Sequence, residues 1–343
     1  MTNENKKKKS IQFWQQLKQD NPECIMALAP MADVTDNPFR RILSEIGPPT
    51  VYWNEFVAAD GLVHPDARPK LERLLTYESD QRPIVAQIFS GDAENCRSAA
   101  SLCAEHGFDG IDINMGCPVK NITKQTSGSE LTKVEHRELV KNILESCRSA
   151  VKETGTEVPI SIKTRLGWNE IDMSWIEFLF TLDLPVLTLH LRTRKEMSKV
   201  PAHWELMTQI REMRDRLSPN TILIGNGDVE SWQQGIELCK EHGIDGVMIG
   251  RGLFVNPWLF NKDLSLEHIS VQKRLELALR HTEYYLEEYT IDGKLTKNFN
   301  LMKKFYKVYI NGFAGAKELR IEMMSAQNID DVKSICQNFL ENM

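Results

Sequence analysis

Eight strand-like runs alternate with segments of helical length between residues 25 and 250, and this alternation is what most constrains the fold. Several runs are continuously apolar, which is typical of parallel strands buried on both faces. Successive βα units predict a closed (β/α)8 TIM barrel. The predicted strands span residues 25–29, 50–53, 84–88, 110–114, 160–164, 186–190, 221–225 and 246–250.

The segments between these strands have helical periodicity. Two of them end in a His-Gly pair, His106-Gly107 and His242-Gly243, where glycine suits a left-handed helix end. A doubly wound open sheet is the competing layout. No GxGxxG motif follows the first strand, so a dinucleotide-binding Rossmann unit has little support.

The chain of 343 residues is long enough for one barrel and a smaller domain. After Phe260 the strand signals stop, and residues 271–289 and 301–310 have helical patterns. We therefore predict a basic, disordered tail within 1–22 that leads into a short amphipathic turn. Solvated side chains are favoured for Lys6 to Lys9, with phosphate contacts as the alternative. The barrel follows at 23–262, and a small all-α helical domain at 263–343.

Composition narrows the class of protein. An apolar content of 41% and a charged content of 26% are ordinary for a soluble globular protein, and no window is apolar enough for a membrane span. The seven cysteines form no CxxC pair, which favours a reduced, cytoplasmic location and no metal. A net charge of −6 argues against a uniformly basic nucleic-acid binder but allows a local basic face.

Nearly every predicted strand ends in a polar or charged side chain, which a purely structural barrel does not require. Function in such barrels lies at the carboxyl ends of the strands. The candidates at these ends are Pro30 and Met31 in APMADVTD, Glu55, Gln87, Asn114 and Cys117 in NMGCP, Lys163, Arg165, His190, Arg192, Arg194, Asn226, Gly227 and Asp228 in GNGD, and Gly250 and Arg251 in GRG.

The loops after the seventh and eighth strands have the pattern of a phosphate site. Gly225, Gly227, Gly250 and Gly252 would let backbone N–H groups approach an anion, and Arg251 would add a charged contact. Tight turns are the structural alternative. The coincidence of both loops at the strands where barrels often bind phosphate favours phosphate binding.

Gln87, Asn114, Lys163 and His190 end strands three to six and are expected to converge over the barrel mouth. Amide and basic groups of this kind suit the polar edge of an isoalloxazine ring, and a cation there stabilises a reduced, anionic flavin. An ordinary ion pair for Lys163 and a satisfied core histidine for His190 are the alternatives.

Cys117 stands between glycine and proline after the fourth strand, in a loop that faces the same mouth. A cysteine there can protonate a carbanion-like centre or act as a nucleophile. Most lone cysteines are small apolar fillers, but the loop setting and polar neighbours favour a chemical role.

At this point the sequence resembles the tRNA-dihydrouridine synthases, over roughly residues 24–327. The resemblance is carried in the barrel by LAPMADVTDNPFRR (28–41), PIVAQIFSGD (83–92), DGIDINMGCPVKNITKQTSGS (109–129), SIKTRLGW (161–168), HLRTRKEM (190–197), IGNGDV (224–229) and GVMIGRGLFVNPWLF (246–260), and in the helical domain by MKKFYKVYINGFAGAKELR (302–320).

The resemblance implies FMN at the barrel mouth, NADPH as its reductant and a uridine flipped out of tRNA as substrate. Hydride goes to C6 of the uracil, and Cys117 matches the family cysteine that protonates C5. Gln87, Lys163 and His190 match positions that hold the flavin ring. Asn226, Gly227, Gly250 and Arg251 match those around its phosphate, Asn114 a residue beside the uracil, and Arg192 one that faces the RNA. We also expect Pro30, Met31 and Asp228 to contact the cofactor, and Glu55, Arg165 and Arg194 to contact the substrate or its RNA.

The helical domain carries a local basic run that suits a polyanion. Seven basic residues lie between Lys294 and Arg320, opposed by Glu318. Phosphate contacts from such a face give sequence-independent affinity, and a solvated surface is the alternative. Within this run, Lys303, Lys304, Lys307 and Arg320 are the candidate RNA contacts.

Three positions depart from the family pattern: Leu191 where glycine is usual, Glu130 within GSELT (128–132), and Val200 within VPA (200–202). They bear on which uridine is the target. Two alternatives stay open: an FMN barrel acting on a small pyrimidine, related to dihydroorotate or dihydropyrimidine dehydrogenases, and a non-catalytic RNA-binding relative. We expect a monomer.

Overall fold

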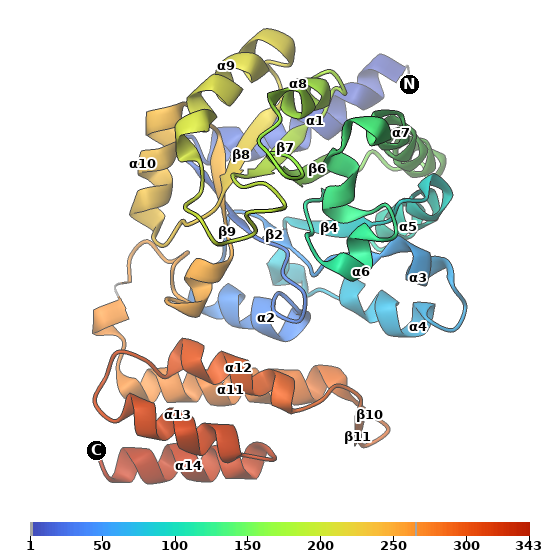
Figure 1. Cartoon of the computed structure of the whole chain (residues 1–343). Coiled ribbons are helices and arrows are strands. Elements are labelled where there is room, and N and C mark those ends of the chain that lie inside the picture. Colours follow the sequence, from blue (N-terminus) through green and yellow to red (C-terminus); the bar gives the residue numbers. More distant parts are fainter. Residues whose placement is uncertain (1–2, 265) are drawn as a thin grey trace.

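The computed structural model describes residues 3–264 and 266–343, with side chains from residue 12 onward, and its main body is a closed parallel barrel (Figure 1). The strands follow the order β1-β9-β8-β7-β6-β5-β4-β2, and a bridge between Ala27 and Val51 closes the ring. The eight predicted strands are confirmed, with some ends shifted by one or two residues. The strands are β1 (Ile25–Leu28), β2 (Tyr52–Trp53), β3 (Val57–Ala58, paired with β4), β4 (Ile84–Phe89), β5 (Gly110–Met115), β6 (Ile160–Arg165), β7 (Val186–His190), β8 (Ile222–Asn226) and β9 (Gly246–Ile249).

Helices surround the barrel, and local signals set their ends. Asp92 caps α5 by accepting from the N–H groups of Glu94 and Asn95. Gly107 and Gly243 have φ of 78° and 66°, so both predicted left-handed helix ends are confirmed. The helices are α1 (Asn3–Asp20), α2 (Asn37–Ile46), α3 (Ala59–Val63), α4 (Arg68–Leu71), α5 (Ala93–Glu105), α6 (Lys120–Thr123), α7 (Arg137–Glu153), α8 (Met173–Phe180), α9 (Met207–Leu217) and α10 (Trp232–His242).

The barrel has two separate hydrophobic cores. The larger one lies between the outer face of the strands and the surrounding helices. The smaller one fills the barrel interior at the amino-terminal ends of the strands, with side chains such as Ile25, Val85, Val186 and Ile222. Because side chains alternate along a strand, each strand contributes residues to both cores. The inward-facing positions near the carboxyl ends of the strands carry polar groups instead.

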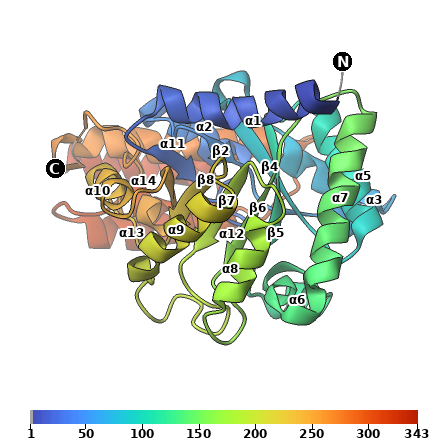
Figure 2. The ribbon, with the colours of Figure 1, turned by 90° about the horizontal axis from the view of Figure 1, so that it is seen from above.

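Helix α1 closes the amino-terminal end of the barrel, where the sequence predicted a disordered tail. Figure 2 shows α1 along one end of the barrel and α6 at the opposite end. Trp14 of α1 is 1% exposed and its ring centroid lies 5.8 Å from that of Trp53 on β2. The prediction of a tail is therefore wrong for 12–20, because the barrel interior supplies an apolar partner. The side chains of Lys6 to Lys9 lie outside the described residues.

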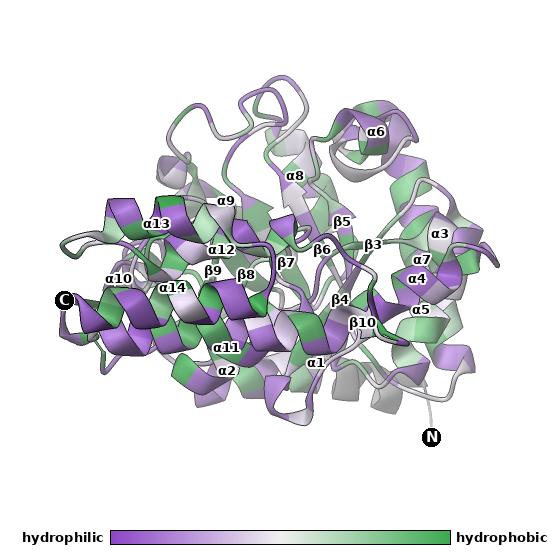
Figure 3. Ribbon diagram, turned by 90° about the horizontal axis from the view of Figure 1, so that it is seen from below, coloured by the Kyte–Doolittle hydropathy of each residue, from purple (hydrophilic) through white to green (hydrophobic). Residues whose placement is uncertain are grey.

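The carboxyl-terminal domain is helical, as predicted. In Figure 3, hydrophilic and hydrophobic segments alternate along α11, α13 and α14, as expected for helices with one buried face. A two-residue antiparallel hairpin departs from the all-α prediction because Asp292 and Gly293, both with positive φ, form a tight turn. The elements are α11 (Val271–Tyr289), β10 (Thr290–Ile291), β11 (Lys294–Leu295), α12 (Asn300–Tyr309), α13 (Ala316–Ser325) and α14 (Ile329–Glu341).

This domain docks on α2 of the barrel (Figure 1). Phe39 packs against His281 of α11 and Phe305 of α12, with ring centroids 5.6 and 5.3 Å apart. The Tyr289 hydroxyl donates to Asp36, the residue that caps α2. The contact is both apolar and hydrogen-bonded, so it holds the helical domain beside the loops at the barrel mouth. Among the described residues, no helix is long and apolar enough to cross a membrane.

Candidate active site at the barrel mouth

A cavity of about 500 Å³ opens at the carboxyl ends of the barrel strands. The inward positions of each strand reach it by alternation, as Lys163 and Arg165 do on β6. The candidate residues that the structure brings together in its lining are Pro30, Met31, Gln87, Asn114, Cys117, Lys163, Arg165, His190, Arg192, Asn226, Gly227, Asp228, Gly250 and Arg251.

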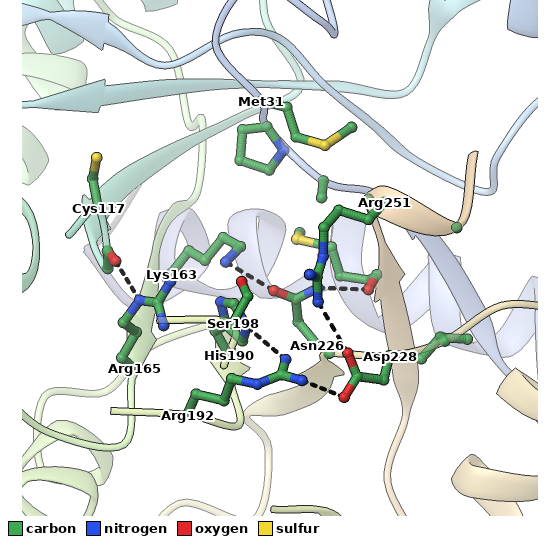
Figure 4. Close-up of a pocket in the computed structure, with 18 of the residues that line it drawn as sticks. Met31, Cys117, Lys163, Arg165, His190, Arg192, Ser198, Asn226, Asp228 and Arg251 are labelled. Atoms are coloured by element: carbon green, nitrogen blue, oxygen red, sulfur yellow. Dashed lines mark hydrogen bonds and ion pairs between the residues drawn. The ribbon is translucent and has the colours of Figure 1, made fainter. Parts of the chain in front are cut away.

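Lys163 and His190 line this cavity between Cys117 on one side and Asp228 and Arg251 on the other (Figure 4). Lys163 Nζ donates to Asn226 Oδ1 at 3.1 Å, and the Asn226 amide donates to the Met248 carbonyl. Burial and then nearby Arg165 lower the pKa of Lys163 to about 8, which leaves it largely protonated near neutral pH. Burial and the same arginine hold the pKa of His190 well below its usual value. The middle of the cavity therefore combines an ammonium with a neutral imidazole.

Asp228 organises two arginines at one side of the cavity. Its carboxylate accepts from Arg251 at 3.0 Å, pairs with Arg192, and accepts the Ala202 N–H at 2.9 Å. The neighbouring Gly227 has φ of +135°, and a Cβ there would lie 2.7 Å from the Cβ of Ala202. Glycine is therefore required at this turn, and the open backbone beside two arginines suits an anion.

Cys117 lies in a loop held by several hydrogen bonds. Asn114 Oδ1 accepts the N–H groups of Gly116 and Cys117 at 3.0 and 2.9 Å. The backbone N–H and hydroxyl of Ser129 both donate to the Cys117 carbonyl, at 3.0 and 2.9 Å. Cys117 is 8% exposed, and burial raises the pKa of its thiol, so the thiol keeps its proton near neutral pH.

The thiol and the Asp228-Arg251 pair lie on opposite sides of the cavity (Figure 4). A ligand with an anionic group and a polar ring can therefore span from Arg251 across Lys163 toward Cys117. Such an arrangement presents a proton donor to whatever is bound against that ligand.

Comparison with known proteins identifies the family. The model of the family described as dihydrouridine synthase (Dus) matches residues 27–343. The chain belongs to this family. It is 39% identical over 339 residues to "Probable tRNA-dihydrouridine synthase 2" of Bacillus subtilis (strain 168), covering 95% of this chain and 96% of that protein. It is 40% identical over 333 residues to "Probable tRNA-dihydrouridine synthase" of Staphylococcus aureus (strain COL), covering 96% of each.

Solved structures support the barrel fold at low sequence identity. A 2-naphthoyl-CoA reductase matches with a TM-score of 0.56 and 12% identity, covering 84% of this chain and 57% of its own. Histamine dehydrogenase from Rhizobium sp. 4-9 matches with a TM-score of 0.53 and 14% identity, covering 82% and 51%. At such identity these likenesses concern the fold alone.

In this dihydrouridine synthase family member, the three arginines predicted to face RNA are largely engaged within the chain. Arg165 is 6% exposed and donates to the carbonyls of Gly116, Thr193 and Met197. Arg192 is 2% exposed and bound to Val200 and Asp228. Arg194 is half-buried, and its guanidinium carbon lies 4.3 Å from the centre of the Trp168 ring. All three shape the mouth and its charge.

Glu55 belongs to a second cluster, where the barrel meets the helical domain. It is 4% exposed, and its Oε1 accepts the Asp33 N–H. Burial and then Asp36 raise its pKa to about 7. Lys297 Nζ lies 3.3 Å from Asp33 and 3.6 Å from Asp36 and partly offsets the acidic charge. The placement of Glu55 therefore favours a role in this interface.

The four predicted basic contacts of the helical domain differ in exposure. Lys303 is only 7% exposed. Lys304 is half-buried against Phe305. Arg320 is half-buried and donates to the Ile310 carbonyl at 2.8 Å. Lys307 is exposed, with its Nζ 5.5 Å from the centre of the Phe254 ring. Of these four, Lys307 is the best placed to meet a phosphate.

The departures from the family pattern have distinct surroundings. Leu191 is fully buried in the outer core. Glu130 pairs with Lys133 at 2.5 Å, and the Val200 carbonyl accepts from Arg192 at 2.6 Å. Leu191 is thus a packing residue, while the other two set local contacts beside the mouth.

The lining also contains Phe56 and Ser198, and Asp112 lies beneath it; none of the three was predicted from the sequence. For Asp112 a signal existed, because it alternates with Asn114 on a strand that is otherwise apolar. Across 3–264 and 266–343, no group of three or more His, Cys, Asp or Glu side chains is arranged to hold a metal ion.

Proposed function

We propose that this protein reduces specific uridines in tRNA to 5,6-dihydrouridine, with FMN as its cofactor, NADPH as the reductant and Cys117 as the proton donor. The observation that carries the proposal is a protonated thiol across one cavity from a cationic pole. It occurs in a chain that matches proteins named tRNA-dihydrouridine synthases over nearly its whole length. We propose a cytoplasmic monomer.

The donor set of the cavity fits FMN. Gly227 and Gly250 leave backbone accessible beside Arg251, which suits a ribityl phosphate, and Asn226 completes that end. Pro30 and Met31 line the same cavity. Lys163, Gln87 and the neutral His190 suit the polar edge of the isoalloxazine ring, where Lys163 would favour negative charge on the reduced ring.

FMN held by these residues would, when reduced, be the source of a hydride for C6 of the uracil. The C5=C6 bond of uracil is conjugated to the C4 carbonyl, so negative charge then develops on C5 and O4. Cys117 holds its proton at Sγ because burial raises its pKa, and it delivers that proton to C5. Asn114, whose side chain lines the cavity beside Cys117, orients the uracil.

The substrate must leave the tRNA stack to reach this cavity. Lys307 on the helical domain would contact the tRNA backbone, and Arg194 at the rim would meet it near the flipped base. The more buried Lys303, Lys304 and Arg320 would add to the local positive potential.

The test begins with the visible spectrum of the purified protein, followed by anaerobic reduction with NADPH and addition of unmodified tRNA. We expect a yellow protein whose reduced flavin is reoxidised by tRNA as dihydrouridine forms. Reoxidation by uracil or orotate but not tRNA would instead support a small-molecule reductase. A colourless protein that binds tRNA would support a non-catalytic relative.

A further inference from the structure

Asp112 lies in the barrel interior beneath the cavity and is fully buried. It stands on β5, in register with Gln87 on β4 and Ser161 on β6. Its Oδ2 accepts from Gln87 Nε2 at 2.6 Å, and its Oδ1 accepts from the Ser161 hydroxyl at 2.5 Å. Both carboxylate oxygens are therefore occupied by protein donors, one of which belongs to the candidate site.

A continuous line of hydrogen bonds runs from Asp112 to the reactive loop. Gln87 Oε1 accepts from Asn114 Nδ2 at 2.8 Å. Asn114 Oδ1 in turn accepts the N–H groups of Gly116 and Cys117. Each amide in this line donates on one side and accepts on the other, so the orientation of each depends on the one before it.

The direction of the line is set at its start. An ionised carboxylate accepts hydrogen bonds and donates none, so Gln87 must turn its NH2 group toward Asp112. Its oxygen then faces Asn114, which must turn its own oxygen toward the loop N–H groups. Reversing either amide would bring two donors together at a buried position, which is costly.

The surroundings of Asp112 are consistent with an ionised carboxylate. Burial raises its pKa to about 6, while Ser161, Gln87 and Lys163 favour its ionised form. The carboxylate is thus mostly ionised near neutral pH, despite lying inside the barrel.

We propose that Asp112 is a positioning residue that fixes the orientations of Gln87 and Asn114 and thereby holds the Cys117 loop against the cavity. Its importance for catalysis rests on the proposed function, but its control of the loop does not. Asp112 touches neither substrate nor cofactor in this account and acts through the two amides.

The test compares Asp112→Asn and Asp112→Ala with Ser161→Ala. Asp112→Asn keeps the shape but lets either side of the new amide face Gln87, because the Ser161 hydroxyl can donate or accept. Asp112→Ala removes the acceptor. Ser161→Ala removes the other hydrogen bond of Asp112 and leaves the line to Cys117 in place. Because the Ser161 hydrogen bond also favours the ionised form of Asp112, the variants are compared at about pH 8, well above the Asp112 pKa of about 6.

The first readout is the rate at which iodoacetamide alkylates Cys117 in the folded protein, followed by mass spectrometry. The buried Cys336 of α14 serves as the internal reference. We expect both Asp112 variants to raise the Cys117 rate by roughly five- to tenfold, the effect of losing about one hydrogen bond of anchoring. Ser161→Ala and the Cys336 rate should stay at wild-type values. An unchanged Cys117 rate in both Asp112 variants, or a parallel rise at Cys336, would overturn the proposal.

The second readout is dihydrouridine formation in a double-mutant cycle with Cys117→Ala. If Asp112 acts through Cys117, Asp112→Asn slows the wild-type enzyme but not the Cys117→Ala enzyme. Equal slowing in both backgrounds would contradict it. A wild-type protein that forms no dihydrouridine, but whose Cys117 alkylation still responds to Asp112, would refute the proposed function and leave the positioning role standing.

Discussion

Arg251 donates to Asp228 Oδ1 at 3.0 Å, and this pair marks one side of the cavity (Figure 4). The Arg251 side chain is 59% exposed, so its guanidinium retains donors for a ligand. If it binds the phosphate of FMN, its effect should depend on that phosphate.

We predict that Arg251→Ala weakens FMN binding by about tenfold or more, the usual worth of a hydrogen bond between charged groups. Riboflavin, which lacks the phosphate, should bind the variant and the wild type equally. Flavin fluorescence titrations measure both constants. An equal loss for the two flavins would place Arg251 away from the phosphate.

Trp14 should be essential to stability although it lies in a segment predicted as a tail. It is 1% exposed and packs against Trp53 inside the barrel end. We predict that Trp14→Ala lowers the free energy of unfolding by about 3–5 kcal/mol, as for other large-to-small core changes. Urea unfolding measures it, with the exposed Gln12→Ala as control. A loss no larger than that of the control would mean that α1 does not close the barrel.

His281 should make stability depend on pH. Burial lowers its pKa from 6.5 to about 3. As pH falls below 6.5, the unfolded chain binds a proton that the folded chain does not, so stability falls. Between about pH 7 and pH 5 this histidine should lower the free energy of unfolding by about 2 kcal/mol.

His281→Phe keeps the ring packing against Phe39 and Phe305 but removes this titration. Urea unfolding across that pH range should therefore give a shallower slope for the variant. The exposed His64→Gln provides the control and should leave the slope at the wild-type value. Identical slopes in wild type and His281→Phe would show that His281 takes up its proton without unfolding.

Lys307 and Lys303 should behave differently toward tRNA despite their proximity in sequence. Lys307 is exposed on α12, whereas Lys303 is 7% exposed. We predict that Lys307→Ala weakens tRNA binding and lowers the slope of log affinity against log salt by about 1, as expected for one lost phosphate contact. Lys303→Ala should lower that slope by clearly less, because its buried side chain adds to the local potential without a direct phosphate contact. Filter binding at several salt concentrations measures these slopes. An unaltered slope for Lys307→Ala would show that Lys307 does not contact the RNA backbone.

The barrel was predictable from sequence because its signals are local. Apolar runs, helical periodicity and helix-ending glycines such as Gly243 each depend on a few adjacent residues. Much of the cavity lining was predictable too, because the carboxyl ends of all strands meet at one rim of a parallel barrel.

What the sequence did not show depends on distant partners. Trp14 is buried because Trp53 lies on another element. Arg165 is tied down by carbonyls from two separate loops, and Asp112 is positioned between strands β4 and β6. The identity of a basic or acidic residue alone does not distinguish such internal roles from contacts with RNA or cofactor.

In the proposed reaction the Cys117 thiol protonates C5 of a tRNA uridine. The most direct measurement is a single turnover of NADPH-reduced enzyme with unmodified tRNA, quantifying dihydrouridine for wild type, Cys117→Ala and the control Cys336→Ala. We predict that Cys117→Ala slows product formation by about 10²–10⁴-fold, the usual contribution of a general acid, while Cys336→Ala matches wild type. Wild-type rates in Cys117→Ala, with its flavin bound and reduced, would contradict the account.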